Sequence, residues 1–245
     1  MSNNKPKVIL LVAGEGKRLH PYTLDKPKCM VQIDGISLID RQLAVLKAEG
    51  LNDIVMIGGY KSEMLARDGI KLKNNPRYFE TNMVWTLFCA EEELEGEVII
   101  SYGDIVYSRH VLQALLKSTA DIAVAIDKGW KDYWSSRSDN LLDDVETLKL
   151  CKDGTISEIG QKPKSLEEIE GQYMGLMKFE PKGWNSFKEC LKKDFNSDFD
   201  NLYLTDVFQK LIEKMFFIKA SKYDRKWAEV DSKKDYLVMK KIFKD

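Results

Sequence analysis

The chain has 245 residues, of which 44% are hydrophobic and 31% are charged. This size favours a globular protein with a substantial core, and a net charge of −1 gives no reason to expect nucleic acid or an anionic membrane as a partner. The four cysteines form no Cys-x-x-Cys pair and only two histidines occur, which disfavours a metal cluster and a Ser-His-Asp triad. No apolar stretch is long enough for a signal peptide or a membrane span, so we expect a cytoplasmic protein.

The first half of the chain alternates short apolar strands with helical patterns. Strands are predicted at 7–13, 53–57, 70–72, 97–101 and 121–126. Helices are predicted from Ser37 to Gly50, from Ser62, over 83–94 and from Ser108. This alternation predicts βαβ units, and therefore an α/β fold with a doubly wound, mostly parallel sheet that has helices on both faces.

After about residue 130 the strand patterns lie closer together. Strands predicted at 145–150, 156–159 and 173–179 are interpreted as an antiparallel insertion at the edge of a mixed sheet. Helices from about 182 and 204, strands at 216–220 and 227–230, and a helix from Ser232 are predicted to follow. We expect one domain over residues 1–245, in which about 128–200 form a substrate-binding lid.

The most informative motif follows the first strand. Gly14-Glu15-Gly16-Lys17-Arg18 is followed by Pro21, Thr23 and Pro27-Lys28. Glycines let the backbone approach phosphate oxygens, successive amides bind anions, and arginine can contact two oxygens at once. A dinucleotide fingerprint would need glycine at Leu19, and a Walker A loop would need Gly-Lys-Ser/Thr, which the sequence lacks. The motif therefore indicates a triphosphate site of a different kind.

Two aspartates each follow a short strand. Asp104 comes after the strand at 97–101, and Asp231 comes after the strand at 227–230. Ligands of doubly wound sheets bind at the carboxyl ends of strands, so Asp104 is expected beside the phosphate loop. Two carboxylates, with waters and substrate phosphates, are sufficient for Mg²⁺. Asp231 could equally cap a helix, and Glu229 could either orient a substrate or be an exposed strand residue.

The N-terminal motif resembles the signature of the sugar-phosphate nucleotidyltransferase superfamily, Gly-x-Gly-x-Arg-Leu-x-Pro-x-Thr-x-x-x-Pro-Lys, at every named position. The resemblance implies a Rossmann-like fold and transfer of a nucleotidyl group to a phosphorylated acceptor, with release of pyrophosphate. It implies catalytic roles for Arg18, Lys28 and Asp104, and an Mg²⁺ site at Asp104 and Asp231. The nucleotide-binding residues that it implies are Val12, Ala13, Gly14, Glu15, Gly16, Lys17, Arg18, Gly59, Tyr60, Tyr102 and Gly103.

Other segments resemble the phosphocholine cytidylyltransferase branch, which includes aminoethylphosphonate and phosphoglutamine enzymes. They are Asn75-Pro76-x-Tyr78, Thr81-Asn82-Met83, the region 127–144, and Leu202–Asp206. The branch implies CTP as the nucleotide and products used for cell-surface or capsule decoration. Lys162-Pro163 matches a pair whose lysine binds the acceptor phosphate in relatives, although Gln161 replaces their usual glutamate. The acceptor-binding residues implied are Asn82, Trp130, Trp134, Arg137, Lys162, Tyr173 and Glu229.

The sequence is compatible with two kinds of acceptor, one with a quaternary ammonium and one with a carboxylate. Trp130, Tyr133 and Trp134 could cage a quaternary ammonium, or could simply pack within the lid. Lys131 and Arg137 favour an acceptor that carries a carboxylate. We expect phosphoglutamine first, then phosphocholine or aminoethylphosphonate, bound by a monomer or homodimer.

Two alternative functions are a hexose- or heptose-1-phosphate nucleotidyltransferase that uses another nucleoside triphosphate, and a non-catalytic nucleotide-binding regulatory subunit. Binding alone rarely needs two metal carboxylates. The joint presence of Arg18, Lys28, Asp104 and Asp231 therefore argues against the regulatory subunit.

Overall fold

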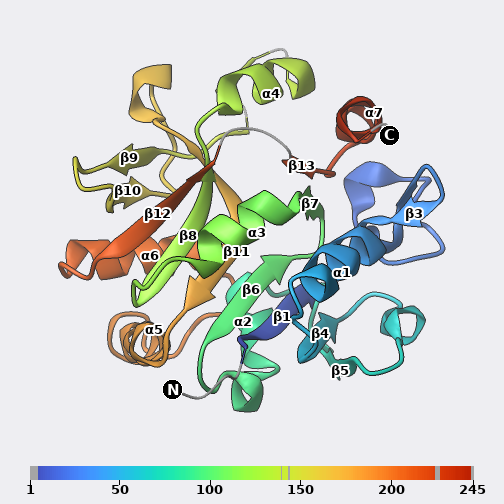
Figure 1. Ribbon diagram of the computed structural model, residues 1–245, viewed down its shortest axis with the longest axis horizontal. Helices are drawn as coiled ribbons and strands as arrows, with labels where there is room; N and C mark the ends of the chain where they lie inside the picture. The colour runs from blue at the N-terminus through green and yellow to red at the C-terminus, as the bar shows by residue number, and fades with distance from the viewer. Residues whose placement is uncertain (1–4, 139, 143, 224–226, 244–245) are drawn as a thin grey trace.

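The computed structural model describes residues 5–138, 140–142, 144–223 and 227–243. The other positions of the predicted domain (1–245), including two positions of the predicted lid (128–200), lie outside the described residues. Its centre is a seven-stranded sheet with the order β12-β8-β11-β6-β1-β4-β5 (Figure 1). These strands are β1 (Lys7–Val12), β4 (Ile54–Gly58), β5 (Lys71–Asn74), β6 (Val98–Tyr102), β8 (Ile122–Asp127), β11 (Gln172–Phe179) and β12 (Ile218–Tyr223).

The sheet is mixed and mostly parallel, which confirms the predicted class. Strand β11 is antiparallel to both β6 and β8, whereas the other neighbouring pairs of the sheet are parallel. The predicted position of this strand, within an insertion at the sheet edge, was wrong. Seven of its eight residues are buried, because strands on both sides and helices on both faces cover it.

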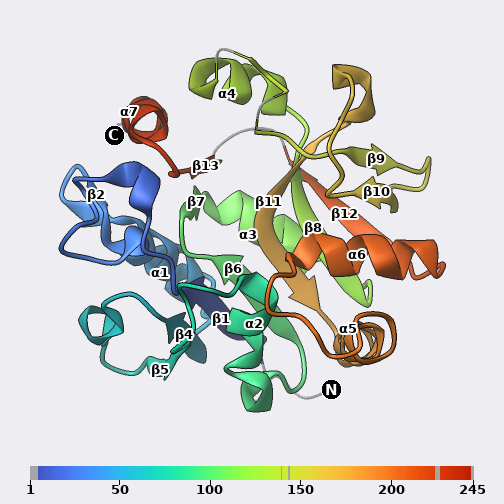
Figure 2. The ribbon, with the colours of Figure 1, turned by 180° about the vertical axis from the view of Figure 1, so that it is seen from behind.

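Helices cover both faces of the sheet, as expected of a doubly wound fold. Helices α1 (Leu38–Ala48) and α3 (Arg109–Leu116) lie on one face (Figure 1), and α2 (Met83–Phe88), α5 (Pro181–Asp194) and α6 (Leu204–Glu213) lie on the other (Figure 2). Strand β1 alternates between the two resulting cores. Leu10 packs in the core with α1, and Leu11 packs in the core with α2.

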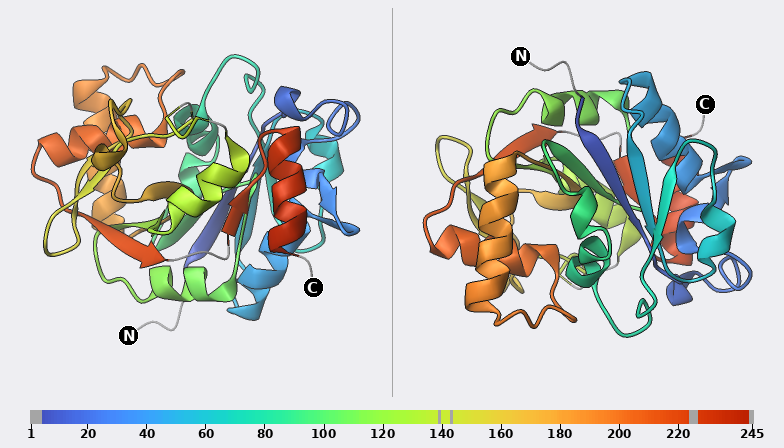
Figure 3. Two further views of the ribbon diagram at one scale, coloured as in Figure 1. Left: turned by 90° about the horizontal axis from the view of Figure 1, so that it is seen from above. Right: turned by 90° about the horizontal axis from the view of Figure 1, so that it is seen from below.

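Several smaller elements lie beyond the carboxyl ends of the parallel strands. They include the antiparallel pairs β7 (Ile105–Tyr107) with β13 (Trp227–Glu229) and β9 (Leu148–Leu150) with β10 (Ile156–Ile159). Helices α4 (Trp130–Arg137) and α7 (Lys233–Ile242) flank β13 when the molecule is seen from above (Figure 3). Whether the region 128–200 acts as a lid remains a prediction.

The remaining elements are short. A hairpin consists of β2 (Gln32–Ile33) and β3 (Ile36–Ser37), and 3-10 turns cover Lys17–Leu19, Lys28–Met30, Ser62–Leu65, Glu91–Glu93 and Leu166–Glu168. The helix predicted over 83–94 ends at Phe88 and is followed by the separate 3-10 turn at Glu91–Glu93. Across the described residues, each helix is too short or too polar to cross a bilayer.

Candidate active site

The loop after β1 folds back so that its end lies beside its start. The amide of Lys28 donates a hydrogen bond to the carbonyl of Gly14 at 3.1 Å, and the Thr23 hydroxyl donates to the carbonyl of Gly16 at 2.8 Å. Gly16 has a φ of +71°, and a Cβ there would lie 2.9 Å from Cγ of Lys28. The second glycine of the motif therefore permits both the turn and the close approach of Lys28.

The turn that carries Asp104 is held from two sides. The amide of Gly103 donates to the carbonyl of Leu11 at 2.9 Å, which fixes the turn to β1. From α1, the buried amide of Gln42 donates to the carbonyls of Tyr102 and Ile105, at 2.9 and 2.6 Å. Our reading of the sequence missed Gln42; its signal was a polar residue at an apolar helical position.

Asp231 reaches the same place from the end of the chain. Strand β13 pairs with β7, and the amide of Val230 donates to the carbonyl of Asp104 at 3.0 Å. The N-cap of α7 is Ser232, which forms a capping box with Asp235. The side chain of Asp231 is therefore not needed to cap the helix.

Lys28 lies between the two aspartates. Its Nζ is 2.6 Å from Oδ2 of Asp104 and also forms an ion pair with Asp231, whose Oδ2 is 3.0 Å from Nη2 of Arg18. Burial opposes the charge of Lys28, but the two carboxylates outweigh it and raise the pKa of the lysine. Burial also opposes the charge of Asp231, but Lys28 holds the pKa of that carboxyl well below its usual range. Both groups are thus charged at neutral pH.

A third carboxylate completes this group. Asp104, Glu229 and Asp231 each offer an oxygen, and these oxygens lie within 4.8 Å of one another. Oδ1 of Asp104 is buried without a hydrogen-bond partner among the described residues. Carboxylate oxygens are the preferred ligands of hard divalent cations, so the residues present fit such an ion. Glu229 adds to the two aspartates that the sequence analysis assigned.

The first cavity beside this carboxylate group has a volume of about 280 Å³. Five predicted nucleotide-binding residues line it, together with Lys28 and Asp104: Val12, Ala13, Gly14, Tyr102 and Gly103. Its wall also includes residues for which the sequence analysis made no nucleotide assignment: Leu11, Cys29, Tyr78, Thr81, Asn82, Met83 and Thr86.

Other predicted nucleotide residues lie around this cavity rather than in its wall. Gly59 packs against Tyr78, and the amide of Tyr60 donates to the carbonyl of Ala13 at 3.1 Å, so both support the wall from behind. The exposed Lys17 pairs with Glu15 at 3.5 Å. Contacts of the loop with phosphates remain a prediction.

The second cavity, of about 490 Å³, is lined by four predicted acceptor residues, Trp134, Lys162, Tyr173 and Glu229, together with Arg18 and Asp231. Met83 and Tyr102 line both cavities, so the two adjoin beside the carboxylate group. The wall also contains residues that the sequence analysis did not assign to a site: Leu142, Asp144, Val145, Glu146, Gln172, Tyr203 and Thr205. Leu142, Asp144, Tyr203 and Thr205 lie in the segments 127–144 and 202–206 that carry the family resemblance, whereas the other three had no such signal.

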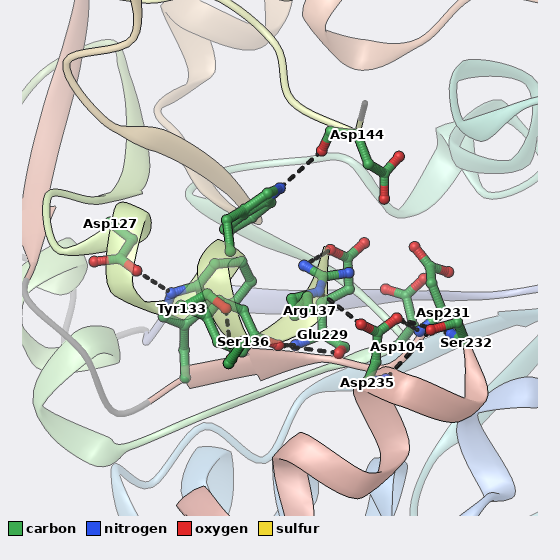
Figure 4. A network of polar contacts seen from close by, with 12 residues as sticks. Asp104, Asp127, Tyr133, Ser136, Arg137, Asp144, Glu229, Asp231, Ser232 and Asp235 are labelled. Atoms are coloured by element: carbon green, nitrogen blue, oxygen red, sulfur yellow. Dashed lines mark hydrogen bonds and ion pairs between the residues drawn. The ribbon is translucent and has the colours of Figure 1, made fainter. Parts of the chain in front are cut away.

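Three predicted acceptor residues lie elsewhere. Asn82 lines the first cavity, because α2 begins beneath β1, and its side chain donates to the carbonyl of Asn201 at 2.8 Å. Trp130 is 1% exposed and belongs to the core. The side chain of Arg137 is 4% exposed and pairs with Glu229 and Asp235 (Figure 4). Neither Trp130 nor Arg137 lines the second cavity, and acceptor binding by these two residues remains a prediction.

The aromatic cluster of α4 is not an open cage. The guanidinium carbon of Arg137 lies 5.1 Å from the ring centre of Tyr133 and 4.7 Å from that of Trp134. The cation that these rings hold is thus supplied by the chain itself.

A doubly wound sheet with a glycine-bearing loop after β1, a lysine-bridged aspartate pair and two adjoining cavities is the arrangement expected of a nucleotidyl-transferring enzyme. Residues 8–173 match the family model of the MobA-like NTP transferase domain, and the chain belongs to this family.

Comparison with curated proteins gives a relative matched over nearly its whole length and another matched over about half of its length. The chain is 40% identical to CTP:phosphoglutamine cytidylyltransferase from Campylobacter jejuni, over 93% of this chain and 96% of that protein. It is 34% identical to choline-phosphate cytidylyltransferase from Streptococcus pneumoniae, over 46% and 51% of the two chains.

Comparison with solved structures shows the same fold. CTP:phosphocholine cytidylyltransferase from Streptococcus pneumoniae superposes with a TM-score of 0.77, at 22% identity, covering 98% of this chain and 99% of that one. The inositol-1-phosphate CTP transferase from T. maritima gives a TM-score of 0.75 at 23% identity, covering 96% and 95%.

Proposed function

We propose that this protein is a Mg²⁺-dependent cytidylyltransferase that transfers CMP from CTP to a small phosphorylated amino acid. The observation that carries the proposal is the meeting of two cavities at one group of three carboxylates and Lys28. The 40% identity to a phosphoglutamine cytidylyltransferase over nearly the whole chain supports CTP and phosphoglutamine as the substrate pair. A cytoplasmic enzyme that supplies CMP-linked groups for capsule decoration fits this assignment.

In the proposed reaction, a phosphate oxygen of the acceptor attacks the α-phosphorus of CTP. The new oxygen–phosphorus bond forms as the bond to the leaving pyrophosphate breaks. The attacking oxygen is already anionic, so alignment and charge neutralisation provide the catalysis and no general base is needed. Lys28 would neutralise charge at the α-phosphate, and Arg18 would bind the β,γ-phosphates. Asp104, Glu229 and Asp231 would hold Mg²⁺, which when bound offsets negative charge on the phosphates.

The residues around the second cavity suit an acceptor that carries both negatively and positively charged groups. Lys162 can bind a phosphate or a carboxylate of the acceptor, whereas Asp144 and Glu146 can bind an ammonium. Because Arg137 fills the aromatic cluster of α4, that cluster is not available to a quaternary ammonium. An amino-acid acceptor therefore fits better than phosphocholine.

Pyrophosphate release in the presence of Mg²⁺ tests the proposal. CTP, UTP, GTP, ATP and dTTP are each combined with phosphoglutamine, phosphocholine, aminoethylphosphonate and several sugar 1-phosphates. We expect release with CTP and phosphoglutamine, and loss of release when EDTA is added. Turnover of a sugar phosphate with another nucleotide would replace the proposal with the hexose- or heptose-1-phosphate alternative. Binding of CTP without turnover of any acceptor would favour the regulatory subunit.

A further inference from the structure

Side chains of helix α4 make hydrogen bonds both to Asp144, which lines the second cavity, and to Glu229 of the carboxylate group (Figure 4). The indole nitrogen of Trp134 donates to the carbonyl of Asp144, which lies in the cavity wall, at 2.9 Å. The hydroxyl of Tyr133 accepts from the amide of Glu229 at 2.8 Å and donates to its carbonyl at 3.1 Å. One helix thus holds both the wall of the second cavity and the backbone of a residue in the carboxylate group.

Arg137, on the same helix, is held in one orientation. Its Nη1 is 3.0 Å from Oε2 of Glu229, and its Nε is 2.7 Å from Oδ1 of Asp235. The rings of Tyr133 and Trp134 lie within 5.1 and 4.7 Å of its guanidinium carbon. A planar guanidinium with two carboxylate partners and two aromatic contacts has little rotational freedom, so it fixes the positions of its partners.

Both carboxylate partners of Arg137 border Asp231. Glu229 precedes Asp231 by two residues, and Oδ2 of Asp235 accepts from the amides of Asp231 and Ser232, at 3.0 and 2.8 Å. Arg137 therefore contacts the segment that carries Asp231 on both sides, through Glu229 before it and through Asp235 after it. Because the arginine side chain is 4% exposed, it reaches an acceptor only through Glu229.

We propose that Arg137 is a positioning residue, which holds Glu229 and the 229–231 segment so that three carboxylates converge on one divalent cation. The expected changes in kcat and KM rest on the proposed function, whereas the expected change in metal affinity does not. Groups that orient metal ligands typically contribute about 10- to 100-fold to metal affinity.

The test compares Arg137→Met and Arg137→Lys with Lys178→Met. Lys178 is a matched control, because its side chain is 3% exposed and pairs with Glu97 at 2.7 Å and Glu180 at 3.0 Å, at the opposite end of β11 from the cavities. Mn²⁺ binding in the presence of CTP is measured by electron paramagnetic resonance, together with the melting temperature, kcat and the KM for the acceptor.

We expect R137M to weaken Mn²⁺ binding by at least about tenfold and to lower kcat more than it changes the acceptor KM. R137K should recover part of the Mn²⁺ affinity, since it restores one charge. K178M should lower the melting temperature and leave Mn²⁺ affinity and kcat at wild-type values. Tyr133→Phe, which removes only a hydroxyl, should weaken Mn²⁺ binding in the same direction and covers the case in which R137M does not fold.

Wild-type Mn²⁺ affinity in R137M, or in Y133F where R137M is unfolded, would overturn the inference. A rise in acceptor KM alone would instead assign Arg137 to acceptor binding. Absence of Mn²⁺ binding to the wild type would also overturn it. Failure of every acceptor to react would refute the proposed function, while the Mn²⁺ comparison would still decide the role of Arg137.

Discussion

The ammonium of Lys28 lies 2.6 Å from Oδ2 of Asp104, although the two residues are 76 positions apart in the chain. The same ammonium forms an ion pair with Asp231, 203 positions away. One lysine of the phosphate loop thus joins the end of β6 to the end of β13. Lys28 lines the first cavity, and its partner Asp231 lines the second, so its charge lies beside the site of the proposed nucleotidyl transfer.

Replacing Lys28 with alanine should lower kcat far more than it weakens CTP binding. The variant loses a positive charge where negative charge develops, and we expect kcat to fall roughly 100-fold or more. Pyrophosphate release gives kcat, and calorimetry gives the CTP dissociation constant. A loss confined to CTP affinity would contradict the role assigned to Lys28.

Asp104→Asn should fold normally and lose activity by at least about 100-fold, because the amide keeps the shape of the side chain but not its charge. Asp34→Asn is a suitable control. Asp34 is exposed at a φ of +51° in the turn between β2 and β3, a conformation that asparagine also tolerates. Wild-type turnover of the Asp104 variant would remove this residue from the site.

Gly16→Ala should impair both stability and activity. A Cβ in left-handed backbone costs about 1–2 kcal/mol, and at this position it also displaces Lys28. Gly69→Ala isolates the first effect, since Gly69 has a φ of +74° and open space around its Cβ position. We expect similar conformational costs in chemical denaturation, but lower kcat in the Gly16 variant alone. Equal activity of both variants would show that the contact with Lys28 is unimportant.

Glu146 should make stability depend on pH. Burial, with Asp206 and Asp144 adding to it, raises the pKa of Glu146 from 4.5 to about 7. Between these values the folded protein keeps a proton that the unfolded chain releases, so this residue lowers stability as pH rises through that window. Glu146→Gln should match the wild type near pH 4 and exceed its stability above pH 7, by on the order of 3 kcal/mol.

Urea denaturation at several pH values measures this difference. Asp144→Asn provides an internal check, because removing one neighbouring negative charge should lower the pKa of Glu146 and shrink the benefit of the glutamine. A constant difference between Glu146→Gln and the wild type across the whole pH range would show that Glu146 has an ordinary pKa.

The alternation of strands and helices predicted most of the sheet, because a buried parallel strand leaves a continuous apolar run. Strand β11 was misplaced because an apolar run indicates that a strand is buried, but does not indicate which strands pair with it. Its place between β6 and β8 depends on contacts with residues far away in the chain.

Helix α4 carries a pattern for which the sequence left two interpretations open. Trp130, Tyr133, Trp134 and Arg137 are spaced by three, four and seven positions, which is the pattern of one buried helical face. From the sequence, the aromatic residues could cage a ligand or simply pack within the lid. In the structure that face is buried, and the guanidinium of Arg137 lies over the rings of Tyr133 and Trp134.

The sequence by itself determined the glycine-bearing turn after β1 and the acidic residues at strand ends, because local steric needs restrict Gly16 and because Asp104 directly follows a strand. Only the tertiary structure decided that Glu229 joins Asp104 and Asp231, that Asp144 and Glu146 line the second cavity, and that Arg137 lies behind Glu229. The reason is physical. Glycine conformation and strand burial are local properties, whereas the convergence of charges arises when β13 pairs with β7 and α4 packs beside α7.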